Sequence, residues 1–152
     1  MTDAAILAAI PHRPPFLMID SILDHTPGEY ARSQRRIAED DPVFVGHFPD
    51  DPVYPGVLIV ENMAQTACFA LASDTSGSTA GPYLLARINQ STFMRKVVPG
   101  ETLVTEARIV RRFERMAEFA CVCKVGDSTV AKAEMLVTFN VPAEPTHRQE
   151  AS

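Results

Sequence analysis

One strongly apolar segment, residues 57–72, predicts a single buried helix. It reads Val-Leu-Ile-Val-Glu-Asn-Met-Ala-Gln-Thr-Ala-Cys-Phe-Ala-Leu-Ala and is apolar on almost every side of a helix. A surface helix keeps a polar stripe towards water, whereas a helix of this composition has to be covered all round. We therefore expect the rest of the domain to wrap around residues 57–72.

The remaining pattern predicts a short helix over residues 3–10 and about six strands separated by turns. The strand-like stretches, rich in apolar and β-branched residues, are residues 16–23, 30–37, 83–93, 101–112, 116–125 and 129–141. Turns such as Gly126-Asp127 favour mostly antiparallel pairing. The pattern thus predicts an α+β architecture in which a curled antiparallel sheet wraps around one long buried helix. Such a sheet has an edge strand, and pairing of two edges would form a dimer.

Three segments are expected to lack regular structure. Residues 39–55 contain four prolines and predict a long loop, and loops of this length are often functional. Residues 73–81, rich in Ser, Thr and Gly, predict a mobile loop, and the polar residues 142–152 predict a disordered tail. We expect one domain over residues 1–141.

Composition excludes several function classes. The chain has 152 residues, of which 46% are hydrophobic, and a net charge of -5, which argues against nucleic acid as the main partner. We expect neither a membrane span nor a secretory signal. The three cysteines indicate core residues of a reduced, cytoplasmic protein, and the four scattered histidines lack the spacing of a metal site.

Two titratable residues between residues 46 and 65 are candidates for acid–base chemistry. His47 lies in Gly-His-Phe-Pro-Asp-Asp-Pro-Val-Tyr-Pro-Gly, where three prolines restrict the backbone, and a rigid loop suits a catalytic base. Glu61 lies inside the apolar helix, where ionisation is costly, so we expect it to hold a proton near neutral pH and to donate it. Gln65, one turn later on the same face, is expected to orient this carboxyl. Taken alone, Glu61 is equally compatible with a structural role in packing two chains.

The start of the buried helix is a further candidate. Pro55-Gly56-Val57 contains no Ser, Thr or Asp cap, so the first N–H groups of the helix lack an acceptor. A substrate carbonyl that gains negative charge would be stabilised there, and Gly56 has no side chain to obstruct it. Water is the alternative acceptor. His12, in Pro-His-Arg-Pro-Pro, is interpreted as a structural residue.

Three segments of the chain resemble the 3-hydroxyacyl-[acyl-carrier-protein] dehydratases of bacterial fatty acid synthesis, of the FabZ type. Residues 11–20 read Pro-His-Arg-Pro-Pro-Phe-Leu-Met-Ile-Asp, residues 46–61 contain Gly-His-Phe-Pro and Pro-Gly-Val-Leu-Ile-Val-Glu, and residues 93–101 read Phe-Met-Arg-Lys-Val-Val-Pro-Gly-Glu. The resemblance covers roughly residues 8–140, and its middle segment is the most specific.

This resemblance implies the hot dog fold and a homodimer, often assembled as a trimer of dimers, with the active site at the dimer interface. His47 of one subunit would face Glu61 of the other, the Gly56 N–H would bind the thioester carbonyl, and Gln65 would orient Glu61. The substrate-binding residues are then expected to be Gly56, Val57, Gln65, Phe48 and Asn62. The implied reaction is dehydration of a 3-hydroxyacyl thioester to the trans-2-enoyl thioester. Acyl carrier protein would be the partner, its phosphopantetheine would carry the substrate, and no metal or bound cofactor would be needed.

Departures from the family pattern leave alternatives open. Asn62 and Thr66 make the helix more polar than expected and suggest an acyl tunnel suited to a specialised polyene or polyketide pathway. Arg95, Lys96 and the Arg111-Arg112 pair are weak candidates for the path of the phosphopantetheine. Two other functions remain compatible with the residues, namely a hot dog acyl thioesterase and a non-catalytic acyl-binding subunit of a heteromer.

Overall fold

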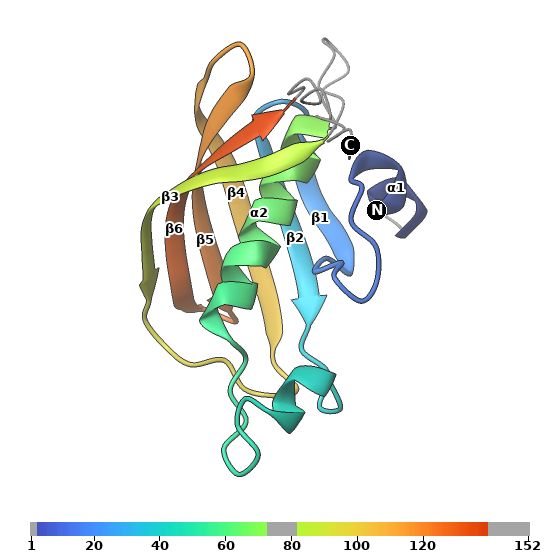
Figure 1. Ribbon diagram of the computed structural model, residues 1–152, viewed down its shortest axis with the longest axis vertical. Helices are drawn as coiled ribbons and strands as arrows, with labels where there is room; N and C mark the ends of the chain where they lie inside the picture. The colour runs from blue at the N-terminus through green and yellow to red at the C-terminus, as the bar shows by residue number, and fades with distance from the viewer. Residues whose placement is uncertain (1–2, 73–81, 140–152) are drawn as a thin grey trace, which may run out of the picture.

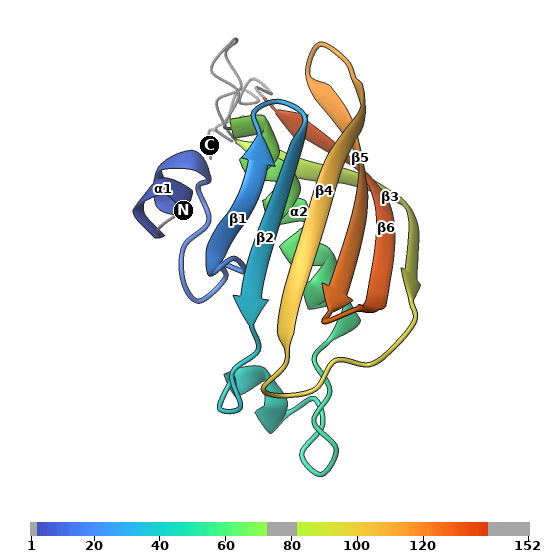
Figure 2. The same cartoon turned by 180° about the vertical axis from the view of Figure 1, so that it is seen from behind.

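One antiparallel sheet curls around one long helix in the computed structural model, which describes residues 3–72 and 82–139 (Figure 1). Its six strands have the order β1-β2-β4-β5-β6-β3, and Figure 2 shows their outer face. In chain order the elements are α1 (Asp3–Ala9), β1 (Ser21–Thr26), β2 (Tyr30–Arg36), the 3-10 turn η1 (Pro42–Val45), α2 (Gly56–Ala72), β3 (Tyr83–Phe93), β4 (Thr102–Arg112), β5 (Met116–Val125) and β6 (Ser128–Phe139).

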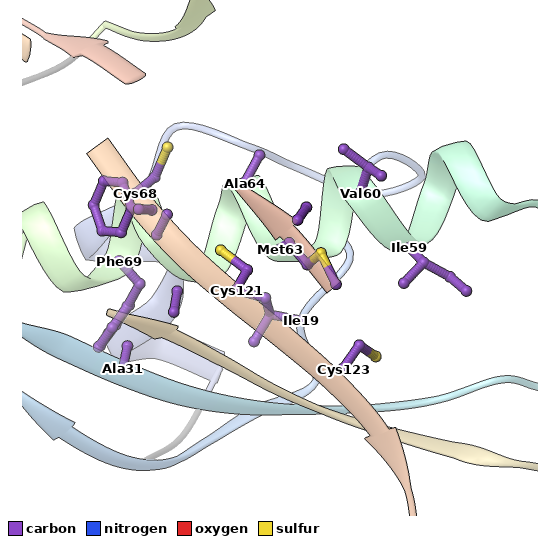
Figure 3. Packing of buried hydrophobic residues seen from close by; sticks show 14 of the residues in the cluster. Ile19, Ala31, Ile59, Val60, Met63, Ala64, Cys68, Phe69, Cys121 and Cys123 are labelled. Carbon is purple, nitrogen blue, oxygen red and sulfur yellow. The ribbon is translucent and has the colours of Figure 1, made fainter. Parts of the chain in front are cut away.

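Helix α2 forms the centre of the core, as its composition predicts. Every residue from Ile59 to Leu71 is buried except Glu61. Figure 3 shows Met63 of α2 and Cys121 of β5 among the side chains of one buried cluster. Although α2 is largely apolar, no helix in the described part of the chain is long and apolar enough to cross a membrane.

The predicted strand over residues 16–23 is wrong in its first half, because β1 begins only at Ser21. The backbone just before β1 bonds to side chains of α2 instead of to a strand. The carbonyl oxygen of Phe16 accepts from Nε2 of Gln65, and the N–H of Met18 donates to Oε1 of Gln65. The other predicted elements agree with the structure to within a few residues, and residues 73–81 and 142–152 lie outside the described part.

Strand β3 lies at one edge of the sheet and is uncovered. It pairs with β6 on one side only, and Tyr83 is its one buried residue. Leu85 is 41% exposed and Ile88 is 44% exposed, which leaves apolar side chains in water beside an unpaired backbone edge. The single chain therefore ends in a surface suited to a second strand.

Candidate active site

His47 is held in a closed loop between η1 and α2. Its N–H donates to the carbonyl of Val43 over 3.0 Å, and the N–H of Val53 donates to the carbonyl of His47 over 3.1 Å. Nδ1 of His47 lies 2.7 Å from the carbonyl oxygen of Val53. Because a carbonyl can only accept, Nδ1 carries a proton and Nε2 is the atom that can take one up. Phe48, which is 51% exposed, stacks on the imidazole with ring centroids 4.1 Å apart.

Glu61 projects from α2 towards the uncovered edge of the sheet. Its Oε1 accepts a hydrogen bond of 2.8 Å from Nε2 of Gln65. The carboxyl lines a cavity of about 290 Å³ whose other walls are largely apolar and include Val57, Leu85 and Phe93. Its side chain is 20% exposed, so water still reaches the carboxyl in the single chain. The reason is that β3 leaves this side of α2 open.

Both ends of the Gln65 amide, Nε2 and Oε1, form hydrogen bonds within the protein. It is completely buried, and its Nε2 donates both to Glu61 and to the carbonyl of Phe16, 2.8 Å in each case. Its Oε1 accepts from the N–H of Met18 over 2.7 Å. The geometry suits a residue that orients Glu61. It does not suit the direct substrate contact that the sequence analysis assigns to Gln65, because no face of the amide is open.

Asn62, which the resemblance places among the substrate-binding residues, lies in the core of the single chain. Its side chain is completely buried, Nδ2 donates to the carbonyl of Met18 over 2.6 Å, and Oδ1 accepts from the hydroxyl of Thr105 over 2.5 Å. Thr66 is equally buried and its Oγ1 lies 2.7 Å from Oγ of Ser33. Asn62 and Thr66 thus both bond to the sheet, and sequence reasoning missed this because their partners Thr105 and Ser33 lie 43 and 33 residues away.

The N-terminus of α2 opens into a second cavity, of about 540 Å³, at Gly56. Among the residues that the structure describes, no acceptor takes the backbone N–H of Gly56 or Val57. A Cβ at Gly56 would lie only 2.8 Å from a ring carbon of Phe93, so a side chain here would displace that ring. Arg95 and Lys96 also line this cavity, and Val57 is 74% exposed. The helix start therefore presents two N–H donors to a pocket bordered by cations.

His47 and Glu61 do not meet within one chain. In the described residues no hydrogen bond or ion pair joins them, and His47 lines neither the cavity at Gly56 nor the one at Glu61. Glu61 instead faces His12, whose Nε2 lies 3.8 Å from its Oε1. Sequence reasoning missed this neighbour because residues 12 and 61 do not lie on the same helix or strand.

Comparison with known proteins identifies the family of this chain. The model of the FabA-like domain matches residues 10–134. The chain belongs to the FabA-like family. This FabA-like protein is 38% identical over 141 residues to the 3-hydroxyacyl-[acyl-carrier-protein] dehydratase FabZ of Yersinia pestis strain Pestoides F, with 92% of this chain and 80% of the relative covered. The FabZ of Yersinia pseudotuberculosis serotype O:1b strain IP 31758 matches to the same extent.

Solved structures confirm the predicted hot dog fold of the FabA-like protein. The dehydratase heterocomplex ApeI:P from Xenorhabdus doucetiae superposes with a TM-score of 0.74 at 12% identity, covering 90% of this chain and 91% of the other. The virulence protein Cj0977 from Campylobacter jejuni superposes with a TM-score of 0.69 at 13% identity, covering 90% and 97%. At such identities the likeness concerns the fold alone.

Proposed function

We propose that this FabA-like protein is a hydro-lyase that removes water from a 3-hydroxyacyl thioester on acyl carrier protein and forms the trans-2-enoyl thioester. The 38% identity to FabZ dehydratases over 92% of the chain supports the reaction class. The observation that carries the proposal is that residues 46–61 supply both a base and a carboxyl. His47 keeps Nε2 as a base, and Glu61 presents a carboxyl in a largely apolar cavity.

The proposed reaction is an elimination in which each group has one task. Nε2 of His47 takes the proton α to the thioester carbonyl, and the carbonyl of Val53 stabilises the resulting imidazolium through Nδ1–H. The N–H of Gly56 donates to the carbonyl oxygen as it becomes an enolate. Glu61 delivers its proton to the departing hydroxyl, which leaves as water while the enolate electrons form the double bond. Solvent then takes the proton from His47 and returns one to Glu61, and no bound cofactor takes part.

We propose that the active unit is a homodimer with His47 of one chain facing Glu61 of the other. The separation of the two residues in the single chain supports this arrangement. Leu85 and Ile88 of the uncovered strand β3 also line the cavity at Glu61, so a second chain paired along β3 would close that cavity. A trimer of such dimers stays a prediction.

Acyl carrier protein is proposed to deliver its phosphopantetheine arm at the cavity beside Gly56. Arg95 and Lys96 line this cavity, whereas Arg111 and Arg112 lie at the opposite end of the molecule, beside the β4–β5 hairpin (Figure 1). Carrier proteins present phosphate at the attachment point, which cations attract. Three buried, unpaired cysteines support a reducing compartment such as the cytoplasm.

Enoyl-thioester formation by His47→Ala and Glu61→Gln variants tests the proposal. With a 3-hydroxyacyl thioester of acyl carrier protein as substrate, we expect each rate to fall by about 10²–10⁴-fold, because a general acid or base is lost. Asp50→Asn is the matched control, since Asp50 is exposed in the loop of His47. A variant that keeps half of the wild-type rate would contradict the assigned pair. Free acid and free thiol as products would instead identify a thioesterase.

A further inference from the structure

His12 lies beside the carboxyl of Glu61 and has no task in the steps above. Its Nε2 is 3.8 Å from Oε1 of Glu61, and the two side chains are 19% and 20% exposed. The same Oε1 accepts the hydrogen bond from Gln65. Two nitrogen groups, the imidazole of His12 and the amide of Gln65, therefore face one oxygen of the carboxyl, and Oε2 makes no hydrogen bond among the described residues.

The position of His12 is determined by contacts on both sides of it. Arg13 donates to the carbonyls of His12 and Ile10 over 2.8 Å each, and to the carbonyl of Leu7 in α1 over 2.8 Å. A few residues later, Gln65 of α2 holds the backbone of this segment. The segment that carries His12 is thus bonded to α1 before it and to the Glu61-bearing helix after it.

The proton of His12 is directed towards Glu61. Nδ1 is buried and has no hydrogen-bond partner among the described residues, so an N–H there would be an unsatisfied donor. Burial lowers the pKa of His12 from its ordinary value of 6.5; the positive Arg13 acts in the same direction, and Glu61 opposes both. The imidazole is therefore neutral at neutral pH, and its single N–H is best placed on Nε2, facing Oε1.

We propose, on the basis of the function proposed above, that His12 is a positioning residue which, together with Gln65, keeps Oε1 of Glu61 as a hydrogen-bond acceptor. An oxygen that accepts two N–H groups is a poor site for the carboxyl proton, which is then carried by Oε2. Oε2 is the oxygen left for the departing hydroxyl. The contact of 3.8 Å is longer than a hydrogen bond. A movement of about 1 Å by either side chain would shorten this contact to the length of a hydrogen bond.

Two variants of the full chain separate this role from a structural one. His12→Gln keeps an N–H donor near the position of Nε2, whereas His12→Leu fills the space without a donor. We expect His12→Leu to lower kcat about 10-fold with KM within about twofold, and His12→Gln to recover most of the loss. Adding His12→Leu to Glu61→Gln should cause no further loss, because its effect acts through Glu61.

His25→Leu is the matched control, because His25 packs against Phe69 of the same helix with ring centroids 5.6 Å apart. Its kcat should stay within twofold of wild type. An inactive wild-type chain would overturn the proposed function and this inference together. With an active wild type, the inference alone is overturned by any of three results: unchanged kcat in His12→Leu, no recovery in His12→Gln, or a further loss in the Glu61→Gln background.

Discussion

At the scale of single residues, hydrogen bonds within the protein decide which atom of each side chain in the candidate site stays available. Val53 engages Nδ1 of His47 and leaves Nε2 as the base. Gln65 engages Oε1 of Glu61 and leaves Oε2. The residue types alone do not contain this information, because either imidazole nitrogen and either carboxyl oxygen is chemically competent. Only neighbouring donors and acceptors select one of them.

The partial burial of His12 leads to a prediction about how the stability of the folded chain depends on pH. Burial holds the pKa of His12 below 6.5 in the folded chain. As the pH falls below 6.5, the unfolded chain binds a proton that the folded chain does not, so the free energy of unfolding decreases until the folded pKa is reached. We expect the stability advantage of wild type over His12→Gln to be smaller at pH 5.5 than at pH 7.5, as measured by urea unfolding.

The decrease in the free energy of unfolding that His12 causes below pH 6.5 is distinct from a decrease that Glu101 causes at lower pH. Hydrogen bonds from Arg95 lower the pKa of Glu101 from 4.5, so its contribution is lost only below that pH. The comparison of wild type with His12→Gln removes the Glu101 contribution, which both proteins share. An unchanged stability difference across the two pH values would contradict a neutral, partly buried His12.

At the scale of elements, α2 is joined to its surroundings by buried polar groups as well as by apolar packing. Asn62 connects α2 to the carbonyl of Met18 and to Thr105 of β4, and Thr66 connects it to Ser33 of β2. These bonds fix the rotation of α2 about its axis, which apolar contacts alone define poorly. That rotation places Glu61 at the open edge.

Removal of the Asn62 amide should affect stability much more than substrate choice. In Asn62→Leu the carbonyl of Met18 loses a donor and Thr105 loses an acceptor, which we expect to lower the free energy of unfolding by about 2–4 kcal/mol. Thr105→Val, which leaves Oδ1 of Asn62 and Sγ of Cys123 without the hydroxyl donor of Thr105, should cost about 1–3 kcal/mol. Denaturant unfolding measures both.

The same Asn62→Leu variant tests whether Asn62 contacts the acyl chain. Because Asn62 is completely buried and bonded within the core, the ranking of rates over a panel of saturated and unsaturated hydroxyacyl thioesters should match that of wild type. A changed ranking of rates in a folded Asn62→Leu variant would support the interpretation that Asn62 lines the acyl path.

Most of the elements could be predicted because their pattern is local. The apolar composition of residues 57–72 and the alternation in β4, β5 and β6 lie within single segments. The strand expected from residue 16 could not be excluded in this way. Phe16 and Met18 read as strand residues, and what removes them from the sheet is Gln65, which lies 49 and 47 residues further along the chain.

At the scale of the whole molecule, one edge of the sheet and the cavity beside it are left open in the single chain. β3 is unpaired on one side, apolar side chains are exposed along it, and the cavity of Glu61 opens there. A carboxyl that is to act as an acid needs a drier environment than the single chain provides. Pairing along β3 would supply that environment and a His47 from the second chain.

Complementation between two inactive variants tests whether His47 and Glu61 of one site come from two different chains. We expect a dimer of one His47→Ala chain and one Glu61→Gln chain to contain one intact site, formed by His47 of the second and Glu61 of the first. After random subunit exchange the mixture should recover about a quarter of the wild-type activity, since half the dimers are mixed and each has one good site. Either variant alone serves as the control. A mixture as inactive as its components would show that both groups act within one chain.

The buried helix, the strands around it and the two residues proposed for the chemistry could all be recognised in the amino-acid sequence. Hydrophobic patterns and proline spacing act over short stretches of chain, and the segment at residues 46–61 is specific enough to indicate its family. The three-dimensional packing was needed to show that Asn62 faces the core, that His12 faces Glu61, and that His47 and Glu61 do not meet within one chain. Those outcomes depend on how α1, α2 and the sheet edge pack together, which is a property of residues distant in sequence.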